Sequence, residues 1–389
     1  HARTMSPSIS NRLHELAQSD IRAMTRRCME VGGINLGQGI CDLPTPPLVR
    51  DAAIQAILDR KSIYSPCEGI LRLRKAISAK LERDNGICAD PRSEIVVTTG
   101  SAAAFTCTLH ALLDPGDGIV IPQPHYGYHV NAARVAGVEV HSLVLAEPEY
   151  MLDADSLRAS LRPNTRAILL CTPGNPSGHM LRREEIECVA EVARERDLLV
   201  ITDEIYEYIR YEGREHLSPA ALADLGPRTV TIMGLSKTFS ITGWRLGYAV
   251  APPAMAEAIA LVHDVFYICA PTPLQYGVTA GFASPPEFFS EMRTDYASKR
   301  ERLFAALTGA GLDPIRPEGA YYMLARSGSL GCSSSREAAF SLLERCGVAS
   351  VPGAAFYSGP QGEDWLRFCF AKEDAELDEA CARLERLGA

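Results

Sequence analysis

The central part of the chain alternates short apolar segments with amphipathic ones, and this alternation restricts the fold more than any other feature. We expect strands in the apolar segments, at residues 94–98, 118–122, 138–145, 166–171, 198–203 and 229–233. We expect helices between them, at residues 102–113, 128–136 and 183–196. Strands that are apolar on both faces are typical of parallel sheets covered by helices on both sides. The sequence therefore predicts an α/β fold with a mostly parallel sheet.

The two ends of the chain follow other patterns. The N-terminal part predicts a helix within the first thirty residues and a short extended piece, and three more helices belong to the central part, at residues 48–58, 70–85 and 252–266. After these, we expect helices at residues 287–310 and 374–387 and strands at residues 321–323 and 365–370. This mixture predicts a smaller α+β domain. A length of 389 residues also exceeds what one core usually fills. We divide the chain into a large domain at residues 46–275 and a small C-terminal domain at residues 276–389. Residues 1–45 form an N-terminal segment that joins the small domain.

Composition narrows the function classes. The net charge is −9 and no basic run is present, which argues against nucleic-acid binding. No apolar run reaches the length of a membrane span, and the N-terminal residues have no apolar signal core. We interpret residues 1–4 as a cloning remnant before a native start at Met5. The 12 cysteines form no C-x-x-C pair and no metal-ligand cluster, so we expect no metal and a reducing, cytoplasmic location.

A lysine and an arginine at short spacing suggest chemistry. Lys237 follows the apolar run 229–233, and Arg245 lies in a segment rich in glycine and aromatic residues. A lysine at a strand end can lose solvent, and desolvation favours the neutral amine that Schiff-base chemistry needs. The guanidinium fork of an arginine suits a phosphate. Together they outline a pyridoxal phosphate site, although a surface pair on a loop would have the same spacing.

Four further motifs follow predicted strands or lie in one. Gly100, Ser101 and Ala102 begin a helix, where backbone amides bind phosphate well, although most such turns are only helix caps. Asn175 lies in a Pro- and Gly-rich turn after residue 171, and it could equally be part of a plain turn.

The other two motifs carry charges that need partners. Asp203 ends a buried strand, where a pyridinium nitrogen would be a suitable partner, and Tyr206 is close enough in sequence to reach the same ring. Arg367 lies inside an aromatic strand, where it requires either a buried acidic residue or the carboxylate of a ligand. Taken alone, none of these motifs decides between the two interpretations.

The order of the motifs is more specific than any one of them. A strand followed by a Gly-rich loop, then Asn175, Asp203 with Tyr206, Lys237, Arg245 and finally Arg367 resembles the class I/II pyridoxal phosphate aminotransferases of fold type I. The resemblance covers nearly the whole chain, from residue 35 to residue 368. It implies a seven-stranded sheet in the large domain and a homodimer with shared active sites.

The resemblance also implies a role for each matching residue. Lys237 would form the Schiff base and move the proton, Asp203 would pair with the pyridine nitrogen, and Asn175 and Tyr206 would hold the 3′-oxygen. The phosphate would be bound by Arg245 with Ser236 and the Gly100–Ser101–Ala102 loop. Tyr126 would stack on the cofactor ring, and Tyr64 would contact the phosphate bound by the neighbouring subunit. The substrate carboxylate would be bound by Arg367, with Gly39 and Asn175 beside it.

Three positions depart from the commonest family pattern. Gly234 stands where many relatives carry a serine or threonine that contacts the phosphate. His125 and Gly127, on either side of Tyr126, differ from the residues most common in the family. The sequences at residues 36–39 and 366–372 are similar to those of the kynurenine, glutamine and methionine aminotransferase branch. No second arginine for a side-chain carboxylate is evident, so the expected amino donor is neutral or aromatic and the acceptor a 2-oxo acid.

Two other functions fit parts of the pattern. A pyridoxal phosphate C–S β-lyase, or a biosynthetic lyase or cyclase, would have the same cofactor site and differ only in its products. A regulatory protein with a retained aminotransferase-like domain would need a DNA-binding segment, for which this chain has no room. We therefore expect an amino-acid aminotransferase.

Overall fold

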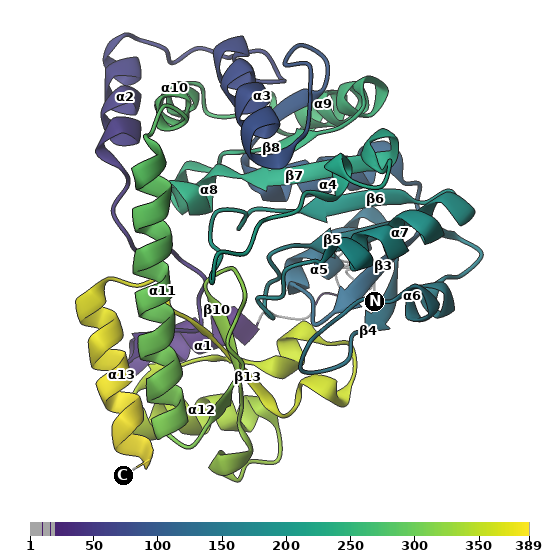
Figure 1. The fold of residues 1–389 in the computed structure, drawn as a ribbon. Helices are drawn as coiled ribbons and strands as arrows, with labels where there is room; N and C mark the ends of the chain where they lie inside the picture. The colour runs from purple at the N-terminus through teal and green to yellow at the C-terminus, as the bar shows by residue number, and fades with distance from the viewer. Residues whose placement is uncertain (1–9, 11–15, 17–19, 389) are drawn as a thin grey trace, which may run out of the picture.

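The computed structural model describes residues 10, 16 and 20–388 (Figure 1). The helix expected in the first thirty residues appears there as α1 (Asp20–Glu30). Apart from residues 10 and 16, the part of that prediction before Asp20, which includes Leu13, lies outside the described residues. None of the helices in the described part of the chain is both long and apolar enough to cross a membrane.

A seven-stranded sheet forms the centre of the molecule, in the order β2-β8-β7-β6-β5-β3-β4. Its strands are β2 (Ile95–Thr98), β3 (Gly118–Gln123), β4 (Glu139–Val144), β5 (Thr165–Cys171), β6 (Leu199–Asp203), β7 (Thr229–Gly234) and β8 (Gly247–Val250). The neighbours from β7 to β4 are parallel, and β8 is antiparallel to both β7 and β2. The predicted α/β fold with a mostly parallel seven-stranded sheet is confirmed, and only β8 was not assigned from the sequence.

Helices cover both faces of this sheet. On one face, apolar side chains of the helices pack against Ile121 and Ile201, and these helices are α4 (Gly100–Leu112), α5 (Gly127–Ala136) and α9 (Pro253–Tyr267). On the other face, Ile186 packs near Val200, and the helices there are α6 (Ala154–Ser160) and α7 (Arg183–Glu195). Three more helices lie around the β2 end of the sheet, namely α2 (Pro47–Leu58), α3 (Leu71–Asn85) and α10 (Thr272–Gly281) (Figure 1). The result is a layer of strands between two layers of helices.

The C-terminal part builds a second sheet, in the antiparallel order β12-β13-β10-β9. Its strands are β9 (Asp313–Pro314), β10 (Tyr322–Arg326), β12 (Val351–Pro352) and β13 (Trp365–Cys369). Three helices pack around it, namely α11 (Pro286–Gly309), α12 (Ser335–Cys346) and α13 (Asp374–Gly388). Figure 1 shows α1 beside this part, and β1 (Ile34–Asn35) pairs in parallel with β11 (Val348–Ala349). The two ends of the described chain therefore share one core, which contains Met24 and Leu303.

Candidate active site

The sheet topology gathers the expected site residues at one edge. Asp203 is the last residue of β6, Asn175 follows β5, and Lys237 lies in the short helix α8 (Leu235–Thr238) directly after β7. The carboxyl ends of parallel strands meet at the same edge, which is where open α/β sheets bind ligands. A cavity of about 270 Å³ lies there. Its lining includes Gly39, Ser101, Ala102, Tyr126, Asn175, Asp203, Tyr206, Ser236, Lys237, Arg245 and Arg367.

The amine of Lys237 points into the site from α8. Its Nζ donates a hydrogen bond of 3.0 Å to the carbonyl oxygen of Gly39 and lies 5.3 Å from the centre of the Tyr321 ring. Burial lowers the pKa of Lys237 to about 8, against the opposing effect of the nearby Cys369 and Cys41 thiols. A substantial fraction of this lysine is therefore neutral near pH 8, as a nucleophilic amine or a general base requires.

Asp203 has a partner that the sequence did not reveal. Its carboxylate is buried, and Oδ2 lies 2.9 Å from Nε2 of His129. The other oxygen, Oδ1, has only a long contact of 3.4 Å with the amide of Ile205. Both Asp203 and His129 line the cavity, so a carboxylate fixed by an imidazole faces the space where a ligand would lie. His129 is three residues after Tyr126, in the first turn of α5, and only the three-dimensional pairing distinguishes it from an ordinary helix residue.

Arg367 lies in β13 and is 1% exposed. Nη1 donates to Oδ1 of Asn175 at 2.8 Å, and Nη2 donates to the carbonyl oxygen of Gly37 at 2.7 Å. The guanidinium carbon lies 4.2 Å from the centre of the Tyr322 ring, and Nε is buried without a partner. No described aspartate or glutamate forms an ion pair with it, so the alternative of a buried acidic partner is not supported by the described residues. A buried cation without a counter-charge favours a ligand carboxylate.

Arg245 also lines the cavity. Its φ of +56° is left-handed, and Nη1 donates to the carbonyl oxygen of Thr242 at 2.9 Å. Gly100 makes room for this side chain, because a Cβ at residue 100 would lie 2.4 Å from Nη2 of Arg245. Ser101 and Ala102, in the first turn of α4, line the cavity beside it. A guanidinium and a helix N-terminus together favour an anion beside them.

Gly234 has a steric explanation. A Cβ at residue 234 would lie 2.9 Å from Cγ2 of Ile205, so the isoleucine occupies the space that a serine or threonine side chain would need. Gly39 is restricted in the same way, because its Cβ would lie 1.9 Å from the hydroxyl oxygen of Tyr322. That hydroxyl is 3.0 Å from the hydroxyl of Tyr206. Tyr322 thus joins the site through both contacts, although the sequence analysis placed it only in a strand.

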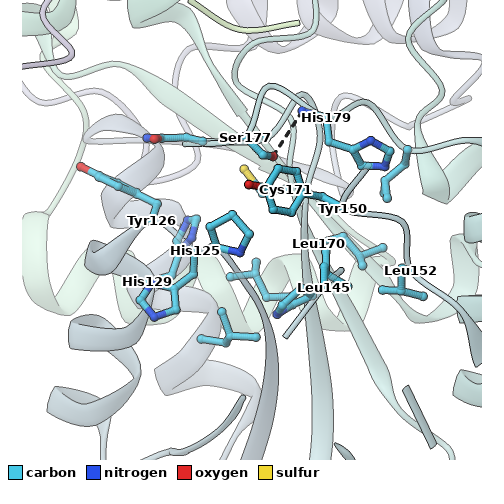
Figure 2. A pocket seen from close by; sticks show the side chains of 17 residues that line it. His125, Tyr126, His129, Leu145, Tyr150, Leu152, Leu170, Cys171, Ser177 and His179 are labelled. Atoms are coloured by element: carbon cyan, nitrogen blue, oxygen red, sulfur yellow. Dashed lines mark hydrogen bonds between the residues drawn. The ribbon is translucent and has the colours of Figure 1, made fainter. Parts of the chain in front are cut away.

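A smaller cavity of about 50 Å³ adjoins the site and shares Tyr126, His129 and Asn175 with it (Figure 2). His125 lines this cavity, is buried, and has no hydrogen-bond partner among the described residues at either ring nitrogen. Burial lowers the pKa of His125 to about 4, so the ring is neutral at physiological pH. Leu170 and other apolar side chains form the opposite wall. The volume suits one or two waters rather than a substrate.

Two expected residues lie outside the larger cavity. Gly100 is beside it, under Arg245, and acts through the space that it leaves. Tyr64 is 76% exposed and does not line the cavity of its own chain. Among the cysteines near the site, Cys41 is buried, and its Sγ is 3.3 Å from the hydroxyl of Tyr296. All 12 cysteines are free thiols.

Comparisons with known proteins agree with this geometry. The profile of the family described as "Aminotransferase class I and II" matches residues 31–384. The chain is 34% identical over 386 residues to aromatic-amino-acid aminotransferase 2 of Thermococcus litoralis, covering 98% of each chain. It is 34% identical over the same length to an aspartate aminotransferase of Pyrococcus abyssi, again covering 98% of each.

Solved structures are similar over the same extent. N-succinyldiaminopimelate aminotransferase from Mycobacterium tuberculosis superposes with a TM-score of 0.94 at 32% identity, covering 98% of this chain and 100% of that one. YbdL from Escherichia coli, which is described with a methionine aminotransferase function, has a TM-score of 0.94 at 29% identity with the same coverage. Because the family profile spans most of the chain and the relatives span nearly all of it, this chain belongs to the class I and II aminotransferases, the pyridoxal phosphate enzymes of fold type I that transfer amino groups between amino acids and 2-oxo acids.

Proposed function

We propose that the amino donor of this aminotransferase is a neutral or aromatic amino acid. The observation that carries the proposal is the set of cations around the cavity. Among the described lining residues, Arg367, Arg245 and Lys237 are the lysines and arginines. If Arg367 binds the α-carboxylate, Arg245 the cofactor phosphate and Lys237 the cofactor itself, none of these cations remains for a side-chain carboxylate. The names of the relatives include both aromatic and aspartate aminotransferases, so this choice rests on the site.

The residues around the cavity fit pyridoxal phosphate. The cavity lining offers Arg245 and the N-terminus of α4 for a phosphate, and the Asp203 carboxylate for a protonated pyridine nitrogen. Gly100 leaves the space that Arg245 needs. The Tyr126 ring is available for stacking, and the Lys237 amine lies within the same cavity. When bound, the cofactor supplies an aldehyde that condenses with amines and a ring that accepts electrons from the substrate Cα.

The residues of the chain would divide the work as follows. Lys237, whose pKa is lowered by burial, would take the proton from the substrate Cα. Asp203, fixed by His129, would hold the cofactor through its pyridine nitrogen. Asn175 and Tyr206, which line the same cavity, would hold the 3′-oxygen. Arg367 orients the α-carboxylate, with the backbone of Gly39 and the amide of Asn175 beside it, so that the Cα–H bond is presented to Lys237.

We also propose a homodimer with shared active sites. Apolar side chains of α2 and the segment after it are exposed, and they include Ile54, Ile57, Leu58 and Ile63. Several large apolar side chains exposed within one short stretch of chain are typical of an interface. Tyr64 lies next to it, so in a dimer its hydroxyl would reach the phosphate bound by the neighbouring subunit.

Organisation and location complete the proposal. We propose a large domain at residues 46–275 and a small domain at 276–389 joined by residues 1–45, which the shared core of α1 and α13 supports. A cytoplasmic location is supported by 12 free thiols, because secreted proteins with many cysteines usually form disulfides.

The test of the donor is a titration of the purified holoenzyme with a panel of amino acids, followed by visible absorbance and by identification of products. We expect neutral or aromatic donors to convert the bound cofactor to its aminated form and to release the matching 2-oxo acid. Faster conversion by aspartate than by every neutral donor would refute the assignment. Pyruvate and ammonia without aminated cofactor would instead identify a lyase, which the aminotransferase names of the relatives do not favour.

A further inference from the structure

A third, larger cavity lies away from the active site, between the segment after β6 and the beginning of α11. Its volume is about 630 Å³, and none of the residues that line it lines the active-site cavity. The segment after β6 contributes Tyr208 and Arg210, and α11 contributes Phe289 and Arg293. The cavity therefore lies where two parts of the chain far apart in sequence meet.

Two arginines in this cavity have no acidic partner among the described residues. Arg293 forms no hydrogen bond or ion pair with a described residue, and burial, with the nearby charge of Arg210, lowers its pKa. Arg210 donates from Nη1 to the backbone oxygen of Arg214, and its Nε is buried without a partner. Two guanidinium groups that line one cavity without acidic partners among the described residues are suited to binding a shared anion.

The acidic residues of the cavity are engaged elsewhere or lie at its rim. Asp84 accepts hydrogen bonds from Arg83 at 2.7 Å and from the Tyr208 hydroxyl at 2.5 Å. Glu207 is buried in an ion pair with Lys80. Glu215 is exposed and forms no ion pair with a described residue. The positive charge of Arg210 and Arg293 is thus left without a buried counter-charge.

The N-terminal end of α11 contributes a partial positive charge beside the cavity, and the acidic Glu287 of its first turn does not line the cavity. The helix begins at Pro286, and its N-cap residue Pro285 offers no side-chain cap, so the first amides of a 24-residue helix lack a side-chain acceptor there. Pro286, Phe289 and Arg293 are spaced by three and four residues, which places them on one face of the helix. The Phe289 ring stacks on Tyr208, with ring centres 4.4 Å apart, and forms an apolar wall.

We propose that this cavity binds a small organic anion, with its carboxylate or phosphate group held between Arg210 and Arg293 and its apolar part against Phe289. The site is separate from the transamination site and does not depend on the proposed donor. Arg210 lies shortly after Tyr206 in the segment that follows β6, whereas Arg293 belongs to α11. A bound anion would therefore link the segment after β6 to α11.

The test is calorimetric titration of the holoenzyme with phenyl phosphate, benzoate and inorganic phosphate at constant ionic strength. We expect saturable binding of at least one probe, weakened about tenfold or more in Arg293→Gln and in Arg210→Gln, as expected for losing a charge-assisted hydrogen bond. Arg316→Gln is the matched control, since Arg316 pairs with Glu301 outside the cavity and its removal should leave binding unchanged. Arg293→Gln removes no hydrogen bond or ion pair between described residues, so it should fold normally.

The probes also separate the two sources of the anion. Tighter binding of phenyl phosphate would assign a phosphate ligand, and tighter binding of benzoate a carboxylate. Phe289→Ala should weaken phenyl phosphate more than inorganic phosphate. The proposal is overturned if no probe binds saturably, or if binding survives in both Arg210→Gln and Arg293→Gln but disappears in Arg367→Gln, which would place the anion in the active site.

Discussion

Replacing Arg367 with glutamine tests the substrate carboxylate site. The guanidinium of Arg367 is buried, has no described acidic partner, and is already oriented by hydrogen bonds of 2.8 Å to Asn175 and 2.7 Å to Gly37. A substrate carboxylate would add two charge-assisted hydrogen bonds, each contributing about 1.5–3 kcal/mol. Their combined loss of about 3–6 kcal/mol corresponds to a decrease in kcat/KM of roughly 100- to 10,000-fold.

The assay is the half-reaction of the holoenzyme with a neutral amino acid, measured beside the amine that lacks its carboxylate. We expect Arg367→Gln to slow the amino acid by this factor and to leave the already slow amine nearly unchanged. Arg326→Gln is the control, since Arg326 also stacks on an aromatic ring, that of Trp365, but pairs with Glu147 and does not line the cavity. An equal loss with both substrates, or a loss below tenfold with the amino acid, would refute the reasoning.

Three further predictions follow from the same geometry. His129→Gln removes the imidazole 2.9 Å from Asp203, and we expect kcat to fall by about 10- to 100-fold with a smaller change in KM; an unchanged kcat in steady-state assays would contradict this role. Gly100→Ala places a Cβ against Nη2 of Arg245 at a φ of +81°, so we expect the dissociation constant of pyridoxal phosphate to rise at least about tenfold, with equal affinities as the contrary result. In the cofactor-free protein, the pKa of Lys237 is lowered from 10.5 to about 8, so the unfolded chain binds more protons between these values and stability from this residue increases from pH 8 to pH 10.5. Lys237→Met should therefore be stabilised relative to the wild type at pH 7, with the difference in Tm shrinking toward pH 10.5; a constant difference would contradict the lowered pKa.

Much of the fold could be predicted because its strands are buried on both faces. The segments that became β5, β6 and β7 are continuous apolar runs, and their alternation with helices leaves few other arrangements. Strand β8 was not predicted because it is short and begins inside the Gly- and aromatic-rich segment around Arg245, which was interpreted for its chemistry. The short β9, β11 and β12 were missed for a related reason, since two residues carry no periodicity.

The site was predictable where a residue's position after a strand indicates its role. Asp203, Asn175 and Lys237 each follow or end a strand of the parallel sheet, so their convergence follows from the topology. His129 and the carbonyl of Gly37 were not predictable, because their partners Asp203 and Arg367 lie 74 and 330 residues away in sequence. The steric role of Ile205 against Gly234 depends on side-chain packing in the same way.

The most direct test of the central claim is to locate the cofactor on the chain. The holoenzyme is reduced with borohydride, digested and analysed by mass spectrometry, with Lys237→Ala as the control. We expect one modified lysine, Lys237, together with loss of turnover and of the modification in the variant. Attachment to another lysine, or substantial turnover by Lys237→Ala, would contradict it.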